Sequence, residues 1–363
     1  MRFIFIALLY AVVLDVQILA QDQSKGKISG LVYADYFYNI LRDSTIQDIP
    51  YKAQFGTKDL NGFAFRRIYF TYDYKISDKF SSRFRLESQS FVDVNNTLFL
   101  VYIKDAYLNW KDIFDGSNLI FGIQPPPTFT VSESFWEYRS LEKTIMDLRR
   151  IATSRDFGLS LKGNLMMNGK VNYWVMVANG TTIGEEGDKY KRIYAHLDFV
   201  PEKDLQITIY GDYRFKPRIS YNGYLGNFNN DALVSSLFIG YKKESSFSIN
   251  LESFIQTTYN DMIETQNSQT VLTNRNAFGL SLFGWYRFEE NITGVLRYDY
   301  FDPNISEYSK GDARNFVVAG VDFKLEENVS VIPNIEFETY QTPVNGISIE
   351  PSLTGRLTLS YNF

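Results

Sequence analysis

The sequence predicts an all-β fold, a sixteen-stranded antiparallel transmembrane β-barrel, from three observations. Apolar and polar residues alternate along short segments, the connections between these segments alternate between tight turns and longer loops, and aromatic residues are abundant without making the chain hydrophobic. Of the 363 residues 17% are aromatic, yet the mean hydropathy is −0.21. This combination indicates strands with one apolar face and one polar face, as in a membrane barrel that encloses water.

The first residues predict an export signal rather than a strand. Arg2 is followed by an apolar run from Phe3 to Leu14, and Ala20 is a small residue at a plausible cleavage point. We therefore expect a cleaved signal peptide over residues 1–20 and a barrel over 21–363. The alternative is a single N-terminal anchor helix. The chain has no cysteine, so an exported form would not depend on disulfides.

Strand-like alternation recurs along the rest of the chain and is cleanest at its end. Leu357, Leu359 and Tyr361 alternate there with Arg356, Thr358 and Ser360. This period of two is that of a strand and not of a helix. Sixteen such segments are predicted to begin near Gly26, Asn61, Phe80, Leu98, Asn118, Ser154, Lys170, Lys191, Leu205, Asp231, Phe247, Arg275, Asn291, Asp312, Val329 and Glu350. The alternation slips near Lys104-Asp105, which predicts a β-bulge.

The connections and the polar faces distinguish a membrane barrel from a soluble one. Short turns at one end and long loops at the other are the wiring of an outer-membrane barrel, with the short turns in the periplasm. Sixteen strands enclose a cylinder too wide for side chains to fill, so charged residues on the inner face indicate a watery lumen. The alternative is a secreted β-sandwich or repeat protein, whose apolar faces would point inward.

The connection over residues 125–153 differs from the others. Pro125-Pro126-Pro127 ends the fifth strand, because proline cannot donate to a strand ladder. Ser132 is a candidate N-cap of a following helix. Apolar residues then recur at spacings of three and four, namely Phe135, Tyr138, Leu141, Ile145 and Leu148. The sequence predicts an amphipathic helix in a loop that folds inward and narrows the pore. The alternative is an external helix that packs on the barrel mouth or on a neighbouring copy.

The region around this connection resembles a known family. The segments Gly122-Ile123-Gln124-Pro125-Pro126, Glu137-Tyr138-Arg139-Ser140 and Ser154-Arg155-Asp156-Phe157-Gly158-Leu159 are similar to the third-loop region of the phosphate-selective porin O/P family. Residues 104–110 resemble the strand that precedes it, and Phe363 resembles the outer-membrane assembly signal. The resemblance is specific only over about residues 104–159. It implies a homotrimeric channel in the outer membrane, with the third loop narrowing each pore.

Charged residues on the inner faces are candidates for lining the pore. A ring of one sign in a narrow passage outweighs charges elsewhere, and guanidinium groups suit phosphate because they bind it bidentately. The candidate residues for the constriction are Arg67, Arg83, Arg85, Arg139, Lys143, Arg149, Arg150 and Arg297. However, residues 133–156 hold five basic and five acidic side chains. Anion preference is therefore a hypothesis, and its alternative is that these charges only solvate a wet wall.

The predicted function is passive diffusion of small hydrophilic solutes, with anions such as phosphate favoured. The alternative is a non-conducting barrel that acts in surface binding or adhesion. The sequence gives no support for an enzyme, a cofactor or a metal site, since the single histidine, His196, is expected in the lumen beside Asp198. Nucleic-acid binding is not expected either, because the net charge is −5 and the basic residues do not cluster. The expected partners are small or anionic solutes and outer-membrane lipid.

Overall fold

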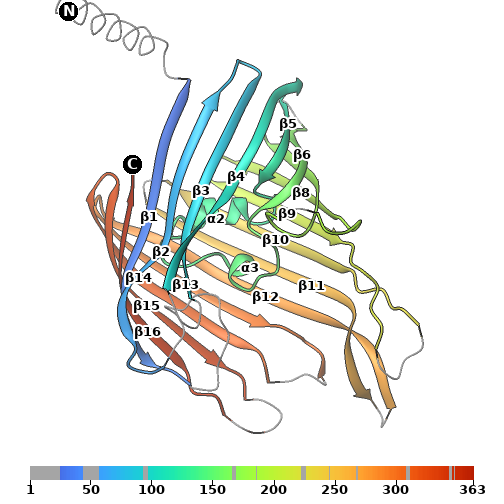
Figure 1. Ribbon diagram of the computed structural model, residues 1–363. Coiled ribbons are helices and arrows are strands. Elements are labelled where there is room, and N and C mark those ends of the chain that lie inside the picture. Colours follow the sequence, from blue (N-terminus) through green and yellow to red (C-terminus); the bar gives the residue numbers. More distant parts are fainter. Residues whose placement is uncertain are drawn as a thin grey trace, which may run out of the picture.

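The chain forms a closed antiparallel β-barrel in the computed structural model (Figure 1). The structure describes residues 25–43, 57–92, 97–165, 169–184, 186–221, 226–244, 246–266, 269–307, 311–342, 346 and 348–363. Each strand pairs with its neighbours in sequence, and β1 pairs with β16 to close the barrel. The sixteen-stranded fold predicted from the alternation is therefore confirmed. The segment expected as a signal peptide, residues 1–20, lies outside the described residues.

The strand boundaries follow the predicted ones closely. The strands are β1 (Gly26–Leu41), β2 (Asn61–Lys75), β3 (Phe80–Val92), β4 (Thr97–Phe114), β5 (Ser117–Gln124), β6 (Asp156–Asn164), β7 (Val171–Ala178), β8 (Arg192–Glu202), β9 (Leu205–Arg214), β10 (Ala232–Lys243), β11 (Phe247–Gln266), β12 (Gln269–Glu289), β13 (Ile292–Asp302), β14 (Arg314–Glu326), β15 (Val329–Tyr340) and β16 (Ser352–Asn362). The predicted first residue of one strand was wrong by more than two positions. β12 begins at Gln269 instead of Arg275, because β11 and β12 continue past a register shift between Thr258 and Met262.

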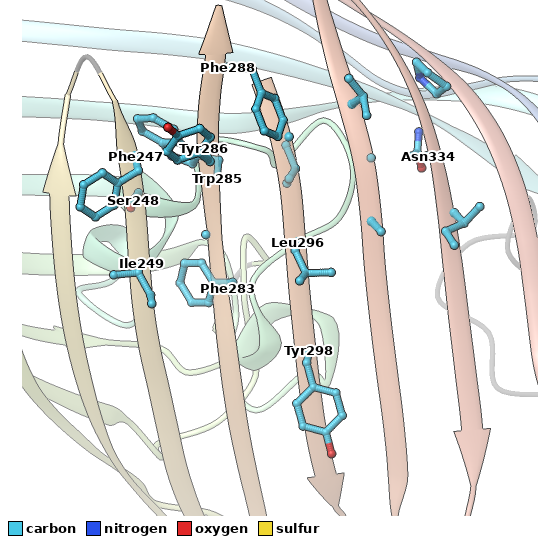
Figure 2. Close-up of a pocket in the computed structure, with 18 of the residues that line it drawn as sticks. Phe247, Ser248, Ile249, Phe283, Trp285, Tyr286, Phe288, Leu296, Tyr298 and Asn334 are labelled. Carbon is cyan, nitrogen blue, oxygen red and sulfur yellow. The ribbon is translucent and has the colours of Figure 1, made fainter. Parts of the chain in front are cut away.

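The two faces of the wall differ as the alternation predicts. On β16, Leu357 is 48% exposed on the outer face, whereas Thr358 is fully buried on the inner face. Tyr286 and Phe288 lie on the outer face near the end of β12, where aromatic side chains suit a membrane interface (Figure 2). β1 begins and β16 ends at the same end of the barrel as the short turns (Figure 1). No helix among the described residues is both long and apolar enough to cross a membrane.

Two bulges turn consecutive charged residues into the lumen. On β4 the register with β3 shifts at Lys104, so Lys104 and Asp105 are both buried on the inner side, which confirms the predicted bulge. On β2 the register with β1 shifts at Arg66, so Arg66 and Arg67 both point inward. The second bulge was not predicted. Each bulge adds one residue to its strand and thereby reverses the faces of the residues beyond it.

The connection between β5 and β6, residues 125–155, folds into the barrel and is called L3 below (Figure 1). It contains two short helices, α2 (Thr130–Trp136) and α3 (Ile145–Leu148). The single helix that the spacing predicted is wrong, because Glu137 takes a left-handed conformation with φ 58° and ends α2. Ser132 lies within α2, whose N-cap is Phe129.

The apolar side of L3 packs on the inner face of the wall from β7 to β15. Its buried residues form two clusters with lumen-facing side chains. The first includes Ile145, Met146, Tyr194 and Phe254, and the second includes Phe135, Trp136, Leu141, Phe283 and Ile332. The sequence suggested that polar residues line the lumen. The structure places apolar residues there as well. About half of the lumen's circumference is an apolar seat for L3, and the polar edge of L3 faces β1–β4.

Candidate functional site

The polar edge of L3 faces the inner wall formed by β1–β4, where the constriction was expected. On this wall the two bulges and the strand alternation gather cations from several strands. Arg66 and Arg67 come from β2, Arg83 and Arg85 from β3, and Lys104 from β4. Arg155 is the last residue of L3 and reaches back to Asp105 of β4. These six residues are called the basic wall below.

Two buried carboxylates on β3 and β4 each bridge two cations of the basic wall. Glu87 Oε1 lies 3.0 Å from Arg67 Nε, and its Oε2 lies 2.6 Å from Lys104 Nζ. Asp105 is likewise paired with Arg155 and lies 3.4 Å from Arg85. Both carboxylates are 1% exposed. Because each group contains two cations and one carboxylate, each carries a net charge of +1.

The basic wall continues toward the short-turn end. Arg83 Nε lies 2.7 Å from Asp73 Oδ1, and its side chain remains 32% exposed. A polar cavity of about 330 Å³ adjoins this pair, and its lining includes Lys27, Lys75 and Tyr107. Cations therefore line the inner wall from the level of L3 to the short-turn end, and they outnumber the carboxylates Asp35, Asp73, Glu87 and Asp105 that lie among them.

The side of L3 that faces this wall carries the opposite balance. Arg139 forms ion pairs with both Glu133 and Asp147, and its Nη2 lies 2.8 Å from Asp147 Oδ2. Burial raises the pKa of Asp147, but the cations Arg139 and Lys143 outweigh it and lower the pKa to about 2. Arg139 and its two ion-pair partners carry a net charge of −1, which the nearby Lys143 partly offsets. This part of L3 is therefore less positive than the basic wall that faces it.

The eight candidate residues divide into three groups. Arg67, Arg83 and Arg85 belong to the basic wall, whereas Arg139, Lys143 and Arg150 belong to L3, where Arg150 has a left-handed φ of 57°. Arg149 instead pairs with Glu338 of β15 at 2.6 Å and lies over the Phe301 and Phe316 rings. Arg297 is 1% exposed, paired with Asp299 and covered by L3. Arg149 and Arg297 thus anchor the loop.

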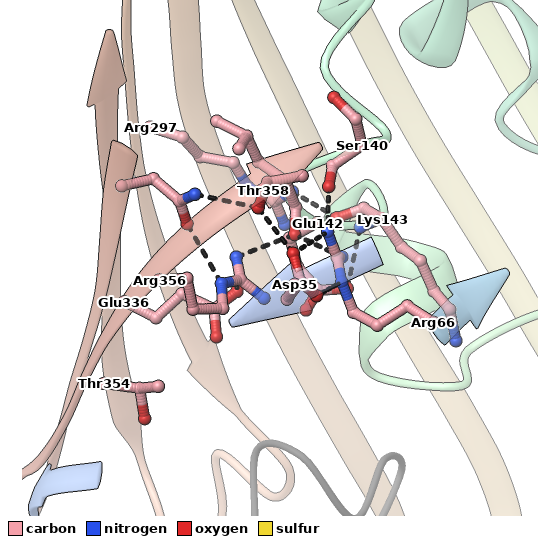
Figure 3. Close-up of polar contacts among 12 residues, drawn as sticks. Asp35, Arg66, Ser140, Glu142, Lys143, Arg297, Glu336, Thr354, Arg356 and Thr358 are labelled. Carbon is pink, nitrogen blue, oxygen red and sulfur yellow. Dashed lines mark hydrogen bonds and ion pairs between the residues drawn. The ribbon is translucent and has the colours of Figure 1, made fainter. Parts of the chain in front are cut away.

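Three arginines hold the far turn of L3 against the wall (Figure 3). Arg66 Nη1 donates to the Leu141 carbonyl at 2.8 Å, and Arg356 Nη2 donates to the same carbonyl at 2.9 Å. Arg297 donates to the Lys143 carbonyl. Each guanidinium also pairs with its own carboxylate, and the three carboxylates are Asp35, Glu336 and Asp299. The turn is therefore fixed by charge-assisted hydrogen bonds, while the cluster around it stays close to neutral.

The start and the end of L3 are held on β8 and β9. Thr128 Oγ1 donates to the Tyr210 hydroxyl at 3.1 Å, and Arg192, which pairs with Asp212 at 2.6 Å, reaches the Ile151 carbonyl at 3.4 Å. The loop is therefore fastened at both ends and at its far turn.

His196 lies on the inner face of β8, as the alternation predicted. Its Nδ1 is 3.1 Å from the Pro127 carbonyl, so the ring supports the start of L3. Among the residues that the structure describes, no three histidine, cysteine or acidic side chains are arranged to hold a metal ion.

The sequence analysis missed Arg66, Lys104 and Arg155 as site residues. A usable signal exists for Arg66. The exposed aromatic residues on β2 are Phe63 and Phe65 before it but Phe70 and Tyr72 after it, which is a change from odd to even positions. The same change marks the Lys104 bulge on β4, between Val101 and Leu108. Such a change of parity beside two consecutive charged residues indicates that both face the lumen.

A sixteen-stranded antiparallel barrel with the loop after β5 folded into its lumen is the fold of outer-membrane porins. No protein-family model matches the chain, and no curated protein matches it in sequence. Solved structures show the likeness. The outer membrane channel DcaP of Acinetobacter baumannii has a TM-score of 0.63 and 13% identity, over 93% of this chain and 97% of that one.

Two further porins of known structure have the same architecture. OmpF of Salmonella typhi, solved in complex with daunomycin, has a TM-score of 0.62 and 10% identity, over 94% of this chain and 98% of that one. An anion-selective porin from Comamonas acidovorans has a TM-score of 0.60 and 12% identity, over 94% and 100%. At such low identity the likeness concerns the fold.

Proposed function

We propose that this protein is an outer-membrane porin, a water-filled channel for passive diffusion of small hydrophilic solutes with a preference for anions such as phosphate. The observation that carries the anion preference is the pair of +1 groups around Glu87 and Asp105 beside L3. The motifs around L3 that resemble the phosphate-selective porin O/P family support the same assignment. The fold supports the channel, because an inward-folded loop narrows a barrel that would otherwise remain wide.

The proposed anion preference depends on the charges near L3 and not on the charge of the whole lumen. Over the whole lumen acidic and basic residues nearly balance, but the groups around Glu87 and Asp105 on the wall contain four cations and two carboxylates, against one cation and two carboxylates in the Arg139 group of L3. Arg85 has a 21% exposed side chain and Arg83 a 32% exposed one, so both guanidinium groups remain accessible from the lumen. Guanidinium groups offer paired donors that match phosphate oxygens. A phosphate entering the passage between L3 and the basic wall would exchange part of its hydration for these donors.

Planar-bilayer recording of the purified protein tests the proposal. In a salt gradient we expect a reversal potential whose sign shows that anions are more permeant than cations. We also expect added phosphate to reduce the chloride current. A reversal potential on the cation side contradicts the anion preference. A well-inserted barrel without open-state current contradicts the channel and favours a surface-binding barrel.

A matched pair of variants localises the effect. Arg85→Gln removes one cation from the basic wall, whereas Arg275→Gln removes one from the long-loop end, where Arg275 is 46% exposed and pairs with Asp261. One charge near the passage contributes about 0.5–1 kcal/mol in water, which is about a two- to fivefold change in permeability ratio. We expect this decrease for Arg85→Gln and little change for Arg275→Gln.

We further propose a homotrimer. β5 and β7 have eight residues each and β6 has nine, whereas β12 has 21. Eight residues at about 3.3 Å each and a tilt of about 40° reach only about 20 Å, less than the apolar band of about 25 Å. Neighbouring copies packed against the short strands β5–β7 would shield this part of the barrel from lipid. Light scattering of the detergent-solubilised protein would give three copies per particle, and a monodisperse monomer would contradict this.

The export signal is proposed with the outer-membrane location. N-terminal sequencing of the protein isolated from outer membranes should begin at Gln21. Recovery of the chain with Met1 intact in the inner membrane would instead favour an N-terminal anchor.

A further inference from the structure

The outer face of the barrel is hollowed over β11–β16. A groove of about 1040 Å³ crosses these strands where small residues, Gly284, Ala319 and Gly355, form its floor. Tyr286, Leu296 and Tyr298 rise beside it (Figure 2). The wall residues are 55%, 62% and 41% exposed, so the groove opens on the outer, apolar surface and not on the lumen. Its volume is at the upper end of the range of small-molecule pockets.

The turn after β12, where Phe288 lines the groove, is acidic, and the same sequence recurs at the turn after β14. The turn between β12 and β13 and the turn between β14 and β15 both read Glu-Glu-Asn, over residues 289–291 and 326–328. All four glutamates are exposed, and none forms an ion pair in the described structure. The nearest cations on the same strands, Arg287 and Lys324, occupy lumen-facing positions in the alternation, and Arg287 lies over the ring of Trp285. On the neighbouring strand, Lys243 is exposed and pairs in register with Phe247, which lines the groove, so this rim holds more carboxylates than cations.

From this combination we infer that the groove binds a phospholipid with an ammonium headgroup, such as phosphatidylethanolamine. The acyl chain fills the groove, because burying apolar surface of both lipid and protein is favourable and the groove floor has no side chains to fill it. The ammonium group lies at the Glu289–Glu290 turn beside Phe288, and the Glu326–Glu327 turn adds negative charge two strands away. An anionic headgroup would be repelled by these like charges. The inference requires the barrel to lie in a bilayer, as proposed above, but not that it conducts.

Native mass spectrometry of the full-length protein, released from bilayers of equal phosphatidylethanolamine and phosphatidylglycerol, tests the inference. We expect the wild type to retain phosphatidylethanolamine about fivefold more than phosphatidylglycerol, since several exposed charges together contribute on the order of 1 kcal/mol. The variant Glu289→Gln/Glu290→Gln/Glu326→Gln/Glu327→Gln should bring this ratio close to one. The control Glu202→Gln/Asp115→Asn removes two exposed carboxylates from short turns away from β11–β16 and should leave it unchanged.

A second variant tests the groove itself. Ala319→Phe places a ring on the groove floor and should reduce retention of both lipids while the headgroup variant changes only their ratio. Equal retention of the two lipids by the wild type overturns the inference. So does an Ala319→Phe protein that keeps its lipid but changes its oligomeric state, because the groove would then be covered by a second copy. Single-channel conductance of the same variants tests the channel separately, so the two proposals fail independently.

Discussion

The guanidinium of Arg66 on β2 donates a hydrogen bond of 2.8 Å to the carbonyl of Leu141, which lies 75 residues further along the chain at the far turn of L3. Arg66 faces the lumen only because β2 has a bulge at this residue. Its charge is balanced by Asp35, whose side chain is fully buried. A local irregularity in one strand therefore helps to decide where the loop crosses the pore.

Replacing Arg66 with methionine should release the far turn of L3 and destabilise the barrel. Met fills much of the same volume but leaves Asp35 buried without this cation. Breaking a buried ion pair in this way costs about 3–5 kcal/mol. We expect that loss in urea unfolding followed by tryptophan fluorescence, together with noisier single-channel currents.

The variant Arg66→Lys separates charge from hydrogen-bond geometry. Lysine keeps a cation beside Asp35 but lacks the planar fork that reaches both Asp35 and the loop carbonyls. Its stability should lie between those of the wild type and Arg66→Met, and the channel noise should remain raised. Quiet channels in both variants would show that Arg356 and Arg297 hold the turn without Arg66.

The alternation of residue types carries most of the information about this fold. It located the strands because each strand must present one face to an apolar medium and one to the lumen. It also located the bulge at Lys104, where the parity slips. It did not locate the end of α2, because nothing in the residue spacing shows that Glu137 takes a left-handed conformation. The extension of β11 and β12 was missed because its apolar residues, Met262-Ile263 and Val271-Leu272, are adjacent and do not alternate with polar ones.

The candidate site was predicted only in part, for a physical reason. Alternation tells which side chains face the lumen but not which strand positions lie opposite each other. The pairing of Glu87 with both Arg67 and Lys104 depends on the register of three strands. The seating of Arg297 beneath L3 depends on the path of a loop. Arg297 thus anchors L3, a role that its charge alone did not reveal.

Glu87→Gln should make the passage more anion-selective and the protein less stable. The amide cannot neutralise Arg67 and Lys104, so the local charge rises from +1 to +2. One extra charge near the passage favours anions by about 0.5–1 kcal/mol, or about two- to fivefold in permeability ratio. Reversal potentials in a salt gradient measure this shift. Glu307→Gln, an exposed carboxylate on a long loop, is the matched control, and an equal shift in it would show that position in the lumen is unimportant.

Gly240→Val should displace α2, because Gly240 makes room for Phe135. A Cβ at Gly240 would lie 2.6 Å from Phe135 Cδ1 and 2.6 Å from Phe238 Cζ, inside a buried ring cluster. Overpacking of this kind costs about 1–3 kcal/mol. Unfolding measurements should show a clear loss in this variant, and the channel conductance should change with the position of α2.

The double variant Gly240→Val/Phe135→Ala tests the contact itself. Phe135→Ala alone should cost about 3–5 kcal/mol, but it also opens the space that the valine needs. The double variant should therefore lose less stability than the sum of the single variants. Gly211→Val is the control, since its added Cβ meets only one atom, at 3.5 Å. Strict additivity would mean that α2 is not seated on Gly240.

Asp147 should make L3 sensitive to acid. Burial raises its pKa, but Arg139 and Lys143 outweigh burial and lower the pKa from 3.8 to about 2. A carboxyl with a depressed pKa stabilises the folded state fully above its unfolded value and loses that contribution as the pH falls toward 2. The shift corresponds to about 2 kcal/mol. Wild type and Asp147→Asn should therefore differ by about that amount in urea unfolding at pH 7, and the two curves should converge between about pH 4 and pH 2. A difference that persists at pH 2, or an equal pH dependence in the exposed control Glu326→Gln, would show that the Arg139 pair does not hold the loop.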